Sequence, residues 1–157
     1  MNLKELYQDI ILEHGKSPRN FGKCKGHNHE AKGHNPLCGD QVHVYLKLNA
    51  DKNVEQLSFE GSGCAISMAS TSIMTELVKG KSLTVAKNLV DAFLNMVKSG
   101  NEMVTKDLTE EQKLKIMSLS GVKQYPMRVK CATLSWHTLV SAIDGKKDDV
   151  NTEIIDS

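Results

Sequence analysis

The feature that most constrains the fold is an abrupt change of hydrophobic period at residues 61–64, the stretch GSGC. Before it, apolar and polar residues alternate from Gln41 to Leu48, and a second short run of this kind covers residues 54–60. A period of two is typical of strands with one buried face. After it, apolar residues recur every three or four positions, which is typical of a helix. The pattern predicts an antiparallel hairpin followed directly by a helix.

Helical periodicity marks the remaining ordered segments. It predicts an N-terminal helix that ends at Gly15, a helix that ends at Gly100 and a last helix over residues 132–144. Thr109 and Gln112 have the spacing of a capping box, which predicts a short helix over residues 110–118. Residues 16–37 are expected to form a long loop with one edge strand. The sequence therefore predicts an α+β fold, with a small three-stranded antiparallel sheet packed against several helices.

The length favours a single domain. A chain of 157 residues is near the commonest domain size and can bury one sizeable core. We expect this domain to occupy residues 1–145 and to be followed by a flexible acidic tail over residues 146–157.

Charge and hydropathy exclude several classes of partner. Lysine and arginine total 20 against 19 acidic residues, a formal net charge of +1, so no overall field attracts nucleic acid or an anionic membrane. The longest apolar run is too short to span a bilayer, and the N-terminus does not resemble a signal peptide. We therefore expect a cytoplasmic protein with no nucleic-acid and no membrane partner. In that compartment cysteines are reduced, so they indicate metal binding or reactivity rather than disulfides.

Three of the four cysteines lie where chain geometry directs their sulfurs outward. Cys38 lies in the turn-like stretch NPLCGD, two residues before Asp40, and side chains at i and i+2 of an extended segment share a face. Cys64 and Cys131 each come at the start of a predicted helix, where unpaired N–H groups favour a thiolate. Three thiolates and one carboxylate suit zinc or an iron–sulfur cluster. We predict a shared metal site formed by Cys38, Asp40, Cys64 and Cys131.

Simpler interpretations exist for some of these residues. A single cysteine in an apolar helix is usually a core residue, and this would explain Cys64 or Cys131 taken alone. It does not explain Cys38, which lies between proline and glycine in a polar loop. Cys24 has no acidic neighbour and no helix start, so we interpret it as a surface thiol. The histidines of residues 27–34 lack the spacing of a metal pair, and the sequence does not assign them a role.

Positive charge lies beside the third cysteine. Arg128 and Lys130 come just before Cys131, and they would offset the negative charge of a metal held by thiolates. Charge alone does not distinguish zinc from a two-iron cluster.

Three motifs together, NPLCGD, GSGCAISMAS and RVKCATLSW, resemble the U-type iron–sulfur cluster assembly proteins over nearly the whole chain. The resemblance implies an α+β domain that receives sulfur from a cysteine desulfurase, with Cys38, Asp40, Cys64 and Cys131 at the ligand positions. Classical IscU-type scaffolds carry a histidine before the third cysteine, whereas this chain has Lys130. The chain is also longer between the second and third cysteines, with the extra residues at about 100–125. Both features resemble the SufU branch.

That branch implies a zinc-dependent sulfur acceptor that relays persulfide sulfur from a SufS-type cysteine desulfurase to downstream cluster-assembly proteins. Cys38 would leave the metal and attack the partner's persulfide, a desulfurase side chain would take its coordination place, and Arg128 would stabilise the freed thiolate. The 100–125 insertion would supply surface for partners.

Two alternatives remain open at this point. The same ligands would hold a two-iron cluster in a scaffold protein, or they would form a structural zinc site in a binding module. The sequence leaves the metal, the oligomeric state and the downstream acceptor undetermined, and enzyme activity of the isolated chain is not predicted.

Overall fold

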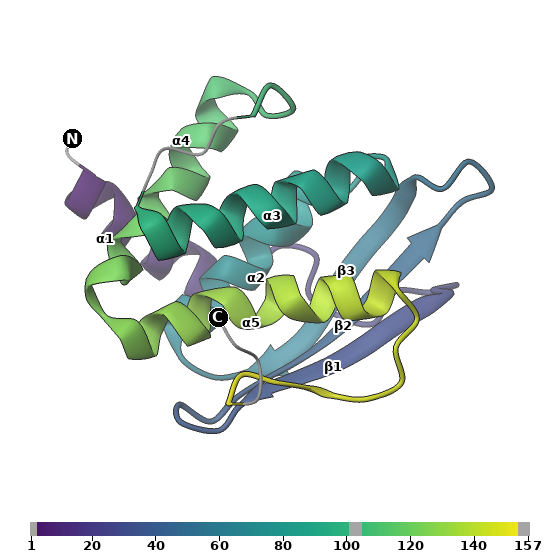
Figure 1. The fold of residues 1–157 in the computed structure, drawn as a ribbon, viewed down its shortest axis with the longest axis horizontal. Helices are drawn as coiled ribbons and strands as arrows, with labels where there is room; N and C mark the ends of the chain where they lie inside the picture. Colours follow the sequence, from purple (N-terminus) through teal and green to yellow (C-terminus); the bar gives the residue numbers. More distant parts are fainter. Residues whose placement is uncertain (1–2, 101–104, 154–157) are drawn as a thin grey trace.

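A layer of helices covers one face of a small sheet in the computed structural model, which describes residues 3–100 and 105–153 (Figure 1). Its strands are β1 (His29–Asn35), β2 (Asp40–Leu48), β3 (Val54–Ser62) and β4 (Val150–Asn151). Its helices are α1 (Leu3–Lys16), α2 (Ala65–Val78), α3 (Leu83–Ser99), α4 (Glu110–Ser118), the 3-10 helix η1 (Leu119–Gln124) and α5 (Pro126–Ile143). The predicted α+β class is confirmed.

The sheet has the order β3-β2-β1-β4. β1, β2 and β3 pair antiparallel as the sequence predicts, and Val44 of β2 lies between Ala31 of β1 and Phe59 of β3. All three of these side chains are buried, which is what the alternating pattern requires of the inner face. β4 adds an edge strand parallel to β1, and it lies within the segment for which the sequence predicts a flexible tail. The sheet is therefore mixed.

The core lies between the inner face of the sheet and the helices. α5 extends along β1 and β2, and α3 packs against α5 (Figure 1). Phe93 of α3 stacks on Trp136 of α5 with ring centroids 4.2 Å apart, and the Trp136 indole N–H donates to Ser70 of α2 at 3.0 Å. Truncation of a fully buried tryptophan such as this one typically lowers the free energy of unfolding by about 3–5 kcal/mol. The Trp136 side chain thus connects α5 to both α2 and α3.

The last helix begins earlier than the sequence predicts. The prediction places its start at residue 132, but α5 begins at Pro126. Proline is favoured at the first helical position because it lacks the N–H that would be unpaired there. The prediction for α4 is confirmed, since the Thr109 side chain and the Gln112 side chain form both hydrogen bonds of the capping box.

The predicted insertion at residues 100–125 contains α4 and η1, and residues 101–104 within it lie outside the described part of the chain. Among the described residues, no helix combines the length and hydropathy needed to cross a membrane.

Candidate metal centre

The first site residue lies in an open turn. Residues 36–39, which we call the Cys38 turn, join β1 to β2, and the Cys38 N–H donates to the Asn35 carbonyl at 3.3 Å. Gly39 has φ +70°, a left-handed conformation that side-chain-bearing residues rarely adopt, and no heavy atom lies within 4 Å of where its Cβ would be. The Cys38 side chain is half-buried. The thiol is therefore accessible and carried by a loosely packed loop.

Asp40 differs from Cys38: its carboxylate is fully buried, and each of its two oxygens accepts a hydrogen bond. Its Oδ1 accepts the backbone N–H of Cys64 at 2.8 Å, and its Oδ2 accepts the side-chain N–H of Asn35 at 3.1 Å. A buried carboxylate is unfavourable unless such donors replace water. The first bond joins the start of β2 to the start of α2, and the second joins it to the end of β1.

Cys64 is the N-cap residue of α2. Its sulfur accepts the backbone N–H of Ser67 at 3.4 Å, which satisfies one of the donors left free at a helix start. The pKa of the Cys64 thiol is lowered to about 6, chiefly by a hydrogen bond with Cys131 and further by the Ser67 N–H, although burial and Asp40 oppose the shift. The lowered pKa agrees in direction with the thiolate predicted at this helix start, but its largest cause is Cys131 and not the helix start.

A glycine lets the start of α2 lie this close to Asp40. Residues 62–64, which we call the Gly63 junction, bring β3 to α2, and a Cβ at Gly63 would lie 2.3 Å from Asp40 Oδ1. Gly63 also has φ +149°, a conformation that favours glycine. Only a residue without a side chain fits there.

Cys131 is buried inside α5 and not at its start, because α5 begins five residues earlier, at Pro126. The predicted effect of a helix start on this thiol is therefore wrong. The pKa of Cys131 is raised, first by its hydrogen bond to Cys64 and then by burial. Both causes favour the protonated thiol over the thiolate at Cys131, and this thiol donates to the sulfur of Cys38 at 3.2 Å.

Three of the four predicted ligands converge. Ligand atoms of Cys38, Asp40 and Cys131 all lie within 4.8 Å of one another, and the sulfurs of Cys38 and Cys131 are 3.2 Å apart. Cys64 lies outside this group, but its backbone N–H bonds Asp40 and its thiol interacts with Cys131. Ligand atoms around a tetrahedral zinc ion are about 3.3–3.8 Å apart, given bond lengths of about 2.0–2.3 Å. The donor set therefore fits a soft tetrahedral metal.

Of the two cations predicted to offset the charge of the site, Arg128 alone faces the sulfurs. Its guanidinium lies 4.0 Å from the sulfur of Cys38. Lys130 is directed away and pairs with Glu153 at 2.9 Å. The pKa of Arg128 is raised, first by a hydrogen bond with Cys131.

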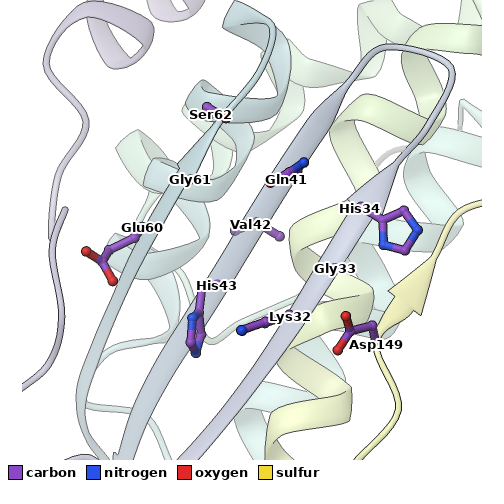
Figure 2. Close-up of a pocket in the computed structure, with 10 residues that line it drawn as sticks. All are labelled: Lys32, Gly33, His34, Gln41, Val42, His43, Glu60, Gly61, Ser62 and Asp149. Atoms are coloured by element: carbon purple, nitrogen blue, oxygen red, sulfur yellow. The ribbon is translucent and has the colours of Figure 1, made fainter.

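The other sequence candidates lie elsewhere. Cys24 is buried, so its interpretation as a surface thiol is wrong; its carbonyl accepts the His27 backbone N–H, and the His27 ring packs against Tyr45. The His43 ring bonds Glu30 at 2.7 Å. In the described part of the chain no histidine belongs to the group of ligand atoms formed by Cys38, Asp40 and Cys131. Figure 2 shows a pocket on the outer face of the sheet, lined by polar side chains that include Lys32, His43 and Glu60, and no residue of the predicted metal site lines it.

One buried contact of the centre was missed by sequence reasoning. Asn35 is fully buried and donates to both Asp40 and Cys131. The signal available was weak: Asn35 precedes Pro36 in the NPLCGD motif, and nothing local shows that it points inward.

Comparisons with known proteins agree with this geometry. Residues 6–132 match the NifU-like N-terminal domain family. The chain is 39% identical over 142 residues to the zinc-dependent sulfurtransferase SufU of Bacillus subtilis, covering 90% of this chain and 92% of that protein. It is 38% identical over 141 residues to the iron–sulfur cluster assembly scaffold protein IscU of Streptococcus pyogenes, covering 90% and 84%. A crystal structure from Fervidobacterium islandicum, described as a SUF-system cluster assembly scaffold, superposes with a TM-score of 0.77 at 35% identity, covering 88% of this chain and 97% of that one.

Proposed function

Since the chain belongs to the NifU-like N-terminal domain family, we propose that it acts in iron–sulfur cluster biogenesis as a zinc-dependent sulfur acceptor. In this proposal Cys38 takes sulfur from the persulfide of a SufS-type cysteine desulfurase. The observation that carries the proposal is the accessible Cys38 thiol beside a buried group made by Asp40 and Cys131. The name of the Bacillus subtilis relative, a zinc-dependent sulfurtransferase, supports it.

Zinc fits the residues present. Cys38, Asp40, Cys64 and Cys131 would hold the ion, and their three sulfurs and one oxygen are ligands that zinc prefers. When bound, zinc would keep the thiols deprotonated and ready for exchange. Because the hydrogen bond with Cys64 and burial raise the pKa of Cys131, metal uptake at neutral pH would displace a proton from this thiol.

The sulfur transfer step uses Cys38 as the nucleophile. Its thiolate attacks the terminal sulfur of the partner's cysteine persulfide; a new S–S bond forms on Cys38, and the partner's S–S bond breaks. The electron pair leaves with the partner's cysteine as a thiolate, so no external oxidant or reductant is needed. Arg128, 4.0 Å from the Cys38 sulfur, stabilises the attacking thiolate. Asp40 stays in place because two hydrogen bonds hold its carboxylate.

The surface around Cys38 suits a protein partner. Leu37, Tyr125 and Met127 are each more than half exposed, although large apolar side chains are usually buried. Leu37 adjoins Cys38 in the chain, and Met127 adjoins Arg128. We assign this apolar surface to the docked desulfurase, which must bring its persulfide to Cys38.

A scaffold function is the second candidate, because the same donor set suits a two-iron cluster and a named scaffold is nearly as similar as the sulfurtransferase. Against it stands Lys130, at the position where the classical scaffolds resembled by this chain carry a histidine. Its side chain pairs with Glu153 and so supplies no ligand. Anaerobic purification with visible-region absorbance and about two irons per chain would favour the scaffold.

The decisive experiment is Cys38→Ser assayed with a SufS-type desulfurase. We expect stimulation of the desulfurase to disappear while the thermal unfolding midpoint stays near that of the wild type, because Cys38 lies in an open turn. Cys24→Ser, a cysteine outside the site, is the matched control and should keep full stimulation. Persulfide mapped to Cys64 or Cys131 and never to Cys38 would contradict the assignment. A structural zinc site would instead make Cys38→Ser as unstable as Cys131→Ser.

A further inference from the structure

Asn35 connects the metal centre to the C-terminal segment. Its amide nitrogen donates to Asp40 Oδ2 at 3.1 Å and to Cys131 Sγ at 3.5 Å, which uses both of its protons. Its Oδ1 accepts the hydroxyl of Thr152 at 2.9 Å. Asn35 is fully buried, so these three protein groups replace water around its amide.

Thr152 is held in place by the sheet. It follows β4 directly, its backbone N–H donates to the carbonyl of His34 at 3.2 Å, and its residue is only 3% exposed. We call residues 150–153 the C-terminal clasp. The clasp reaches the centre a second way, since Glu153 pairs with Lys130, the neighbour of Cys131.

The orientation of the Asn35 amide decides what the site residues meet. In the observed orientation N–H groups face the Asp40 carboxylate and the Cys131 sulfur. A flipped amide would turn its carbonyl oxygen towards the carboxylate, and two acceptors would then repel each other. The Thr152 hydroxyl donates to the amide oxygen and so favours the observed orientation.

We propose that Asn35 is a positioning residue for Asp40 and Cys131, and that the C-terminal clasp sets its orientation through Thr152. This inference rests on the proposed function, in which Asp40 and Cys131 are metal ligands. Groups that orient metal ligands typically change metal affinity by about 10–100-fold when they are removed. The clasp thus contributes to the centre although the nearest ligand along the chain, Cys131, lies 21 positions before Thr152.

The test compares hydroxyl-bearing and hydroxyl-free residues at position 152. Thr152→Val keeps the shape and removes the hydroxyl, and we expect zinc affinity, measured by competition with a chromophoric chelator, to fall about tenfold. Thr152→Ser should stay within about threefold of the wild type, because its hydroxyl still reaches Asn35. Thr138→Val is the matched control: this buried hydroxyl donates to the Leu134 carbonyl within α5, away from the Asn35 amide, so zinc affinity should not change.

A second readout needs no metal. In the metal-free protein, NMR spectra should show the Asn35 side-chain amide protons shifted and exchanging faster in Thr152→Val than in Thr152→Ser. Should Thr152→Val fold poorly, the Thr152→Ser and Thr152→Ala pair isolates the hydroxyl, because both lack the methyl group. Equal zinc affinities and equal Asn35 signals within that pair would overturn the inference. A wild-type chain that fails to bind zinc would overturn the proposed function instead, and the Asn35 signals would still decide the role of Thr152.

Discussion

The Cys38 turn and the Gly63 junction both deliver site residues, and they are built in opposite ways. Around Gly39 there is open space, whereas a Cβ at Gly63 would overlap Asp40. Cys38 is half-buried and makes one backbone hydrogen bond within its turn, while Cys64 is bonded through its backbone to a buried carboxylate. Each turn uses a glycine, in one case for a left-handed backbone alone and in the other also for close approach.

The difference divides the centre into a fixed part and a movable part. Asp40, Cys64 and Cys131 are held by buried hydrogen bonds and by a helix, so they keep their places when a ligand leaves. Cys38 is the ligand that leaves in the proposed function, and the open space at Gly39 beside it leaves its turn room to move. Such a division is what a site needs if one thiolate is to be both a ligand and a nucleophile.

The test with the largest expected effect substitutes Gly63 and Gly39, the glycines of the fixed and the movable part. Gly63→Ala should lower the free energy of unfolding by about 2–4 kcal/mol, since the new methyl group overlaps Asp40 and the backbone is strained. Zinc affinity should fall by about 100-fold, because Asp40 must move. Gly39→Ala, the matched control, should cost only about 1 kcal/mol for its left-handed backbone. Urea unfolding of the metal-free protein and zinc titration measure both.

Equal losses at the two positions would contradict the division into fixed and movable parts. So would a Gly39→Ala variant with the larger loss of zinc affinity, because the Cys38 turn would then be the rigid element.

The sequence predicts some elements around the centre correctly, and these are the elements with a clear hydrophobic period. The start of α2 was predictable, because the period changes at GSGC and a cysteine follows at once. The inward face of β2 was predictable for the same reason, since Val42 and Val44 alternate with polar residues. Local periodicity reports which residues share a face, and this suffices for single elements.

Contacts between distant segments leave no such local signal. The bond from Thr152 to Asn35 joins residues 117 positions apart, and neither residue lies in a pattern that indicates the other. The start of α5 was missed because Met127, Val129 and Cys131 recur every two residues, a period that does not indicate a helix, while Pro126 fits a turn or a helix start equally well. Cys24 was misjudged because its burial depends on the tertiary packing of its loop.

A second test examines the charge within the fixed part. The pKa of Cys64 is about 6, and the largest cause is the hydrogen bond from Cys131. In metal-free protein, alkylation of Cys64 should therefore rise with pH through a midpoint near 6, because the thiolate is the reactive form. Cys131→Ala removes that donor and should move the midpoint upward, slowing alkylation of Cys64 at pH 7 by roughly tenfold. Site-resolved mass spectrometry measures the rates.

Cys64 of the wild type, taken through the same pH series, is the reference. A midpoint for Cys64 that stays near 6 in Cys131→Ala would show that the helix start and the Ser67 N–H suffice to hold the thiolate.

The smallest effect on stability and zinc affinity is expected from the ion pair at the surface of the C-terminal clasp. This test asks whether the fixed part of the centre depends on that surface charge. Glu153 and Lys130 are partly exposed, and exposed ion pairs typically contribute less than about 1 kcal/mol. Glu153→Gln should therefore change the free energy of unfolding by less than about 0.5 kcal/mol and zinc affinity by less than about twofold. Urea unfolding and the chelator competition check this, with Thr152→Val as the reference for loss of a buried bond. A larger effect of Glu153→Gln than of Thr152→Val would mean that surface charge, rather than the buried bond to Asn35, anchors the clasp to the centre.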